Sequence, residues 1–191
     1  MAPVLIHVYG NATLAPETRA GWPEHLGSEV ALRGARLRSP VVNMGSRSLD
    51  TFADVVRAVG QEQRALDGVT AVLALSYTDG RSDRLAPSEA ALFASLGVDH
   101  LLARGADRVL VVGPTAGHAL PGKRTAVGYG GYARWLRRTE KAVRESLGDL
   151  ALFVPLSGLT VDLTRDGVRP TPAGWKWVAG TVADAMAGVA R

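Results

Sequence analysis

The sequence contains no cysteine, so disulfide bonds, thiolate nucleophiles and cysteine-ligated metal sites are excluded. Its four histidines show no metal-ligand spacing such as HxxxH, and we expect no protein zinc site. No apolar run reaches the ~18 residues of a membrane span. No basic segment followed by an apolar one opens the chain, so we expect a cytoplasmic protein without membrane contact.

Motifs for nucleotide cofactors are also missing. No GxGxxG turn follows the first predicted strand and no P-loop occurs, so no cofactor is expected. Aromatic residues are only 6% of the chain, and the net charge is +4. The densest basic group shares one predicted helix with Glu140 and Glu145, which favours a solvated helix face over a nucleic-acid surface. This group comprises Arg134, Arg137, Arg138, Lys141 and Arg144.

The sequence does have enough apolar material for a packed core. Of its 191 residues, 47% are hydrophobic and 21% are charged, which excludes a disordered chain. This length fits one domain, and no repeat, low-complexity stretch or linker divides it. We therefore expect a single domain over residues 1–191 with a small molecule as its ligand. These observations do not determine the oligomeric state.

Short apolar runs alternate with segments of helical periodicity along the whole chain. Unbroken apolar runs are typical of parallel strands that are buried on both faces. The pattern predicts strands over residues 3–9, 40–43, 69–75, 108–112 and 150–154, and helices over residues 16–34, 49–66, 87–104, 131–147 and 171–190. Five βα units imply a three-layer α/β fold, in which helices cover both faces of a five-stranded parallel sheet.

Some local features of these elements are also predicted. Ser48 or Asp50 is the expected N-cap of the second helix. The fourth strand is expected to end at the pair Gly113-Pro114. Trp22, Leu26 and Val30 are expected on the inward face of the first helix, with Leu32 as a further candidate, and Tyr132 and Trp135 are expected on the inward face of the fourth.

Two long irregular segments, 76–86 and 114–130, follow the carboxyl ends of predicted strands. Ligands bind at that edge in open α/β sheets, and long loops there are often functional. His118 lies in the second segment, so it is the best candidate among the histidines for proton transfer. The alternative is that His118 is a solvated loop residue. The other three, His7, His25 and His100, fall within a predicted strand or helices.

Four short blocks, each at a strand end or a helix start, occur in order along the chain. They read Gly10-Asn11-Ala12, Asn43-Met44-Gly45-Ser46, Ser76-Tyr77-Thr78-Asp79 and Asp166-Gly167-Val168-Arg169-Pro170. Together they resemble the four blocks of the SGNH (GDSL-type) hydrolases, over nearly the whole chain. The resemblance implies a flavodoxin-like fold with a site lined by these blocks. The candidate substrate-binding residues are Gly10, Asn11, Ala12, Gly45, Ser46, Tyr77 and Thr78.

The chain departs from this family at its catalytic positions. Ala12 matches the serine nucleophile, and Arg169 matches the histidine base. Thr78 matches the oxyanion asparagine, whereas Gly45 and Asp166 match the oxyanion glycine and the base-orienting aspartate in identity. Alanine has no heteroatom to attack an ester, and arginine, with a pKa above ~12, accepts no proton at neutral pH. The hydrolytic route of the family is therefore not expected.

We therefore hypothesise a non-hydrolytic acid–base enzyme on an SGNH-like scaffold. It would cyclise, dehydrate, isomerise or cleave a small carbonyl-containing or anionic metabolite, in a setting such as natural product biosynthesis. Arg169 and the Gly45 N–H would hold developing negative charge, while Asp79, His118 or a tyrosine would move the proton.

Other interpretations stay open at this point. In purely structural roles, Arg169 forms an ion pair with Asp166, and Asp79 caps a turn. The whole chain is alternatively an inactive domain that binds a metabolite or a partner protein without changing it. A further alternative is an esterase with relocated catalytic groups, in which Thr13 or Ser46 supplies the hydroxyl.

Overall fold

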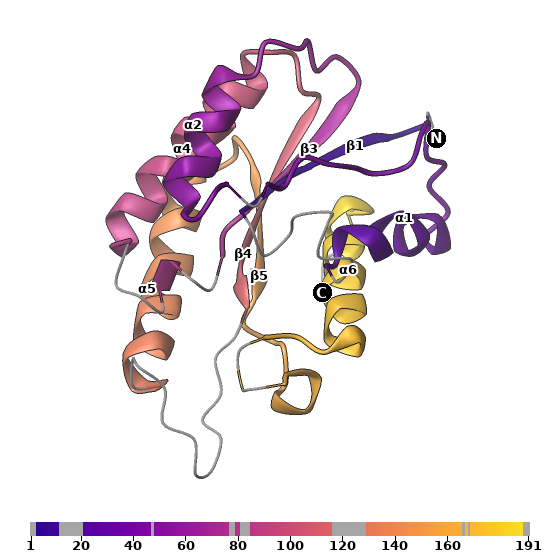
Figure 1. Cartoon of the computed structure of the whole chain (residues 1–191). Coiled ribbons are helices and arrows are strands. Elements are labelled where there is room, and N and C mark those ends of the chain that lie inside the picture. The colour runs from indigo at the N-terminus through magenta and orange to yellow at the C-terminus, as the bar shows by residue number, and fades with distance from the viewer. Residues whose placement is uncertain are drawn as a thin grey trace.

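A single sheet of five parallel strands forms the centre of the molecule, in the order β2-β1-β3-β4-β5 (Figure 1). The strands are β1 (Leu5–Tyr9), β2 (Val42–Asn43), β3 (Val69–Ala74), β4 (Arg108–Thr115) and β5 (Leu152–Leu156). The structure is a computed structural model, and it describes residues 3–11, 21–46, 48–76, 79–80, 85–115, 129–165, 167 and 169–188. The strand order and the parallel pairing confirm the predicted sheet.

Helices cover both faces of this sheet, which confirms the predicted three layers (Figure 1). Helices α1 (Pro23–Leu32) and α6 (Pro172–Met186) lie on one face. Helices α2 (Phe52–Gln61), α4 (Pro87–Leu102) and α5 (Tyr129–Leu147) lie on the other. A 3₁₀ turn, η3 (Val161–Leu163), precedes α6. Each set of helices buries its own hydrophobic cluster against the sheet.

Alternation along each strand divides the side chains between the two clusters. In β3, Ala71 and Leu73 pack toward α2, α4 and α5, whereas Val72 and Ala74 pack toward α1 and α6. All four side chains are buried. This burial on both faces explains why the strands read as unbroken apolar runs in the sequence.

Helix α2 begins later than either predicted cap would allow, by one residue for Asp50 and by three for Ser48. Thr51, not Ser48 or Asp50, is the N-cap: its backbone is extended, and its side-chain oxygen accepts a hydrogen bond from the backbone N–H of Asp54 at 3.2 Å. The Asp54 carboxylate in turn accepts the Thr51 backbone N–H at 3.1 Å, which completes a capping box. Hydrogen bonds from Thr51 lower the pKa of Asp54 below its ordinary value of 3.8.

Strand β4 continues past the predicted stop at Gly113-Pro114 and ends at Thr115. The pairing with β5 shifts register between Val112 and Thr115, where Thr115 pairs with Leu156. An irregularity of this kind allows a proline within a strand, because the ladder is locally interrupted. The extension brings the backbone of Thr115 to the carboxyl edge of the sheet.

Helix α1 has the predicted inward residues Trp22 (its N-cap), Leu26 and Val30, all of which are buried. The expectation for Leu32 is wrong, because this side chain is 75% exposed. Leu32 is the last residue of the helix, and the chain turns away two residues later at Gly34, which has a φ of 79°.

Helix α4 packs against the sheet largely through small residues, together with Val98 and Leu101. Ala94 and Gly97 face the core, and a Cβ added at Gly97 would lie 2.6 Å from Leu73 Cδ2. Leu92 and Leu96 are 57% and 40% exposed. The close approach of the helix therefore depends on side-chain size, which apolar periodicity alone does not encode.

We predict that Thr51→Ala lowers the free energy of unfolding by about 1 kcal/mol, because one orphan N–H of α2 loses its acceptor. The ionised Asp54 carboxylate contributes stability that is complete above pH ~4 and is lost as pH falls through its lowered pKa, so the substitution should also weaken this acid dependence. Urea unfolding at several pH values measures both effects. Ser48→Ala is the matched control and should change little; equal losses in the two variants would contradict the assignment of the cap.

Candidate functional site

The carboxyl ends of the strands gather a small pocket, at the edge where the sequence predicted a site. Three polar residues line it: Asn11, which lies shortly after β1, Ser76, which lies shortly after β3, and Thr115, which ends β4. Trp22 and Trp175 enclose it from the side of α1 and α6. Its volume is about 20 Å³, enough for about one water molecule. The described residues thus form a narrow, mainly apolar pocket with three polar side chains in its lining.

Asn11 and Asp79 both hold the start of helix α2. Asn11 Nδ2 donates to the backbone oxygen of Asp50 at 3.3 Å. Asp79 is fully buried, and its Oδ1 accepts the backbone N–H of Phe52 at 3.0 Å. The other carboxylate oxygen of Asp79, Oδ2, accepts the backbone N–H of Ser76 at 3.3 Å. The carboxylate therefore connects the end of β3 to the first residue of α2, where a helix N-terminus favours negative charge.

The predicted oxyanion donor Gly45 lies shortly after β2, and its N–H donates to Asn43 Oδ1 at 2.9 Å. Asn43 thus supplies the acceptor that an oxyanion would otherwise supply. The neighbouring hydroxyl of Ser46 lies 2.9 Å from Ser48 Oγ and accepts the Ser48 backbone N–H at 3.3 Å. Both candidates are half-buried and engaged locally.

Arg169 lies just before α6, and its side chain is exposed. Its backbone oxygen accepts the Arg165 N–H at 2.8 Å, which closes the turn that leads into the helix. Thr171 then caps α6 by accepting the Gly174 N–H at 3.1 Å. A Cβ at Gly174 would lie 2.2 Å from the backbone oxygen of Leu163, so only glycine fits this helix start without a shift. This local packing fixes the backbone from which the Arg169 guanidinium extends.

Several predicted site residues lie outside the described residues: Ala12, Tyr77, Thr78, His118 and Asp166. The alternative nucleophile Thr13 also lies outside them. Gly10 is described and buried, directly before Asn11. The structure therefore brings Asn11 and Asp79 together at the start of α2, and it leaves the predicted roles of the other candidates as predictions.

The other histidines do not line the pocket in the part of the chain that the structure describes. His7 is half-buried within β1, and burial lowers its pKa below 6.5. His25 lies on α1 and His100 on α4, where it packs against Gly60. Tyr9 is buried in the cluster beneath α2, α4 and α5, and burial raises its pKa. Tyr9 therefore packs in the core.

Two aromatic residues of α5, Tyr132 and Trp135, donate hydrogen bonds to the backbones of Thr115 and Leu85. Tyr132 donates its hydroxyl to the backbone oxygen of Thr115 at 2.7 Å. Trp135 donates its indole N–H to the backbone oxygen of Leu85 at 2.6 Å, and the two rings stack at a centroid distance of 5.7 Å. The Trp135 ring also lies over Gly80, where an added Cβ would be 2.1 Å from it.

Residues 3–11, 21–46 and the other described ranges contain no group of three or more acidic or histidine side chains that could hold a metal ion. Within the same ranges, no helix is long and apolar enough to cross a membrane.

Solved structures of esterases share this fold across almost the whole chain. An aryl esterase from M. smegmatis aligns with a TM-score of 0.66 and 15% identity, covering 98% of this chain and 100% of the other. A putative lipolytic protein of the G-D-S-L family from Desulfitobacterium hafniense gives 0.65 and 13%, covering 94% and 98%. An acetyl esterase with a serine-to-alanine substitution and acetate ion gives 0.68 and 13%, covering 97% of each chain.

These likenesses confirm the fold that the four sequence blocks predicted. No family model matches the sequence, and no curated protein matches it significantly. At such identities the shared feature is the scaffold, and the chemistry must be argued from the residues of this chain.

We predict that Asp79→Ala lowers the free energy of unfolding by about 2–4 kcal/mol, because the buried N–H groups of Phe52 and Ser76 lose their acceptor. Chemical denaturation measures the loss. Asp107→Ala is the matched control: Asp107 accepts the Gly68 N–H at 3.1 Å on the surface, where water can replace it, so the loss should be under ~1 kcal/mol. Equal losses would show that the Asp79 contact has no special weight.

Proposed function

We propose that this chain is a non-hydrolytic enzyme on an esterase-type scaffold. It binds a small carbonyl-containing or anionic metabolite at the carboxyl ends of the strands and moves a proton on it. One observation carries the proposal: Ala12 and Arg169 stand at the sequence positions of the nucleophile and the base. Ester hydrolysis by a serine route needs a hydroxyl and a proton acceptor at these positions, and this chain has neither there.

The described contacts support a positioning role for Asp79 in this proposal. Both of its oxygens accept backbone hydrogen bonds at the start of α2, and the side chain is fully buried. We therefore assign proton transfer to His118 or Tyr77, the candidates that remain on the segments that follow β4 and β3 in the sequence. His118 follows Thr115, whose backbone oxygen accepts the Tyr132 hydroxyl, and Tyr77 precedes Leu85, whose backbone oxygen accepts the Trp135 indole N–H.

Arg169 is the proposed anion-binding group. Guanidinium presents a planar fork of N–H donors that fits a carboxylate in a bidentate manner. Its side chain is exposed and lies shortly before α6, the helix whose Trp175 lines the pocket. The acetate found with the serine-to-alanine acetyl esterase supports a small carboxylate as the first ligand to test here.

A second candidate function is an esterase with relocated catalytic residues, which the esterase structures of the same fold favour. Ser76 and Thr115 add two pocket hydroxyls to the earlier candidates Thr13 and Ser46. Such an enzyme still needs a general base, and His118 is the histidine left for that role. An inactive binding domain would share the proposed ligand site but show no turnover.

We predict that the wild-type chain neither hydrolyses p-nitrophenyl acetate above the buffer rate nor reacts with a fluorophosphonate probe. The combined substitutions Ala12→Ser, Thr78→Asn and Arg169→His should introduce both activities, because they return the nucleophile, the oxyanion donor and the base to one scaffold. Mass spectrometry of the labelled peptide locates the adduct at position 12. Labelling of the wild-type chain at any hydroxyl would refute the proposal and establish the relocated esterase.

We further predict that acetate binds the wild-type chain and that Arg169→Gln weakens this binding about 10-fold or more, because a charged hydrogen-bond donor is lost. Ligand-observed NMR titration measures the two dissociation constants. Arg57→Gln, on the exposed side of α2, is the control and should leave the constant unchanged. Equal binding by Arg169→Gln and wild type would remove Arg169 from the site.

A further inference from the structure

A second cavity among the described residues lies at the opposite end of the sheet from the candidate site. Its volume is about 240 Å³, against about 20 Å³ for the pocket at the strand carboxyl ends. The floor is made by Val4, Thr70 and Arg108, which lie at the amino ends of three neighbouring strands. The walls come from the last turns of α1 and α6. This space is therefore separate from the candidate site.

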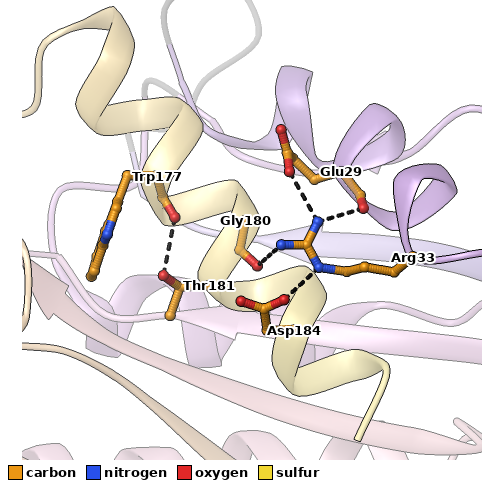
Figure 2. A network of polar contacts seen from close by, with 6 residues as sticks. All are labelled: Glu29, Arg33, Trp177, Gly180, Thr181 and Asp184. Carbon is orange, nitrogen blue, oxygen red and sulfur yellow. Dashed lines mark hydrogen bonds and ion pairs between the residues drawn. The ribbon is translucent and has the colours of Figure 1, made fainter. Parts of the chain in front are cut away.

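An ionic contact joins α1 and α6 (Figure 2), and its arginine, Arg33, also lines the cavity. Arg33 donates from Nε to Asp184 Oδ1 at 2.6 Å and from Nη1 to Glu29 Oε2 at 2.9 Å. Its Nη2 donates to the backbone oxygen of Gly180 at 3.0 Å. Arg33 is thus committed to protein partners, and its two carboxylates line the neighbouring groove rather than the cavity. The contact fixes the two helices relative to each other, so the cavity is preformed.

Most of the cavity lining is apolar. Besides Val4 on the floor, these side chains are Val30, Ala35, Ala183, Met186 and Ala187. An apolar cavity holds water poorly, and one of about 150 Å³ is large enough to bind benzene. The lining therefore favours a ligand with a compact aliphatic or aromatic body.

Arg108 supplies a cation at the rim. Its Nη1 donates to the Met186 backbone oxygen at 2.8 Å and its Nη2 to the Ala185 backbone oxygen at 3.2 Å, which caps the end of α6. The side chain is exposed, and no carboxylate pairs with it among the residues placed in the structure. A guanidinium has five N–H donors, so donors remain for an anion. Unlike Arg33, Arg108 has no acidic partner among the described residues.

We propose that this cavity is a second binding site, for a small monocarboxylate whose apolar body enters between α1, α6 and the sheet while its carboxylate binds Arg108. Thr70 offers a hydroxyl on the floor for a further polar group of the ligand. The proposal is independent of the chemistry at the strand carboxyl ends, because no residue lines both spaces in the described structure.

The test uses the methionines as reporters. The chain has three, of which Met186 lines the cavity and Met44 follows β2 at the other end of the sheet. Protein labelled with [¹³C]methyl methionine is titrated with sodium hexanoate and followed by NMR, and Met186→Leu assigns the signal. We expect a saturable shift of the Met186 methyl, and the same shift in Arg169→Gln, in which carboxylate binding at the candidate site is weakened. Absence of a saturable Met186 shift overturns the proposal.

Variants test the carboxylate contact and the apolar contact of the proposed ligand separately. Arg108→Met keeps an apolar stem and should raise the hexanoate dissociation constant at least 10-fold, whereas Arg57→Met, the control, should not change it. 1-Hexanol should bind more weakly than hexanoate to the wild type, and equal binding would overturn the carboxylate assignment. Ala35→Phe should abolish the Met186 shift by filling the space; if it does not fold, Thr70→Leu replaces it. An unchanged constant in a folded filling variant overturns the location.

Discussion

The candidate site depends on how the N-terminus of α2 is held between two strand ends. Asn11, after β1, binds the backbone of Asp50, and Asp79, after β3, binds the backbone of Phe52. The Phe52 N–H is one of the backbone donors at a helix start that have no partner within the helix, and Asp79 supplies its acceptor. Asn11 holds the backbone just before this start. The buried carboxylate of Asp79 also accepts the Ser76 N–H. A single polar junction therefore sets the positions of the first and third strand ends, and with them the pocket floor.

This junction explains how the fold can be retained while the residues at the catalytic positions change. The contacts of Asn11 and Asp79 are made to backbone groups, so they do not require a serine at position 12 or a histidine at position 169. A pocket at the strand ends thus persists in a chain that has Ala12 and Arg169 instead. Similarity of fold to esterases at 13–15% identity reports on that scaffold, and the reaction is decided by the side chains placed on it.

The sheet was predictable from sequence because two-sided burial leaves a plain signal, as in the apolar run of β3. Features that depend on contacts between distant segments were not. Thr51 and Ser48 are both plausible caps by residue type, and the capping box with Asp54 selects Thr51. Inward packing of Trp135 follows from helical periodicity, whereas its hydrogen bond to Leu85, fifty positions away, follows from the tertiary fold. Residue types therefore identified the site region, and long-range partners define its geometry.

An ionic contact sets the spacing of α1 and α6 beside the cavity at the amino ends of the strands. At the amino end, Arg33 joins two carboxylates whose side chains are only 10% and 14% exposed, those of Glu29 and Asp184. Moving α1 toward α6 to fill the cavity would disturb this arrangement, and an unpaired buried charge costs about 3–5 kcal/mol. Closing a void of this size recovers at most a comparable amount, since cavity volume costs about 24 cal/mol per Å³ and the space is partly open to solvent. The ionic contact therefore fixes the helix spacing, and the empty volume beside Arg108 is a consequence of that spacing.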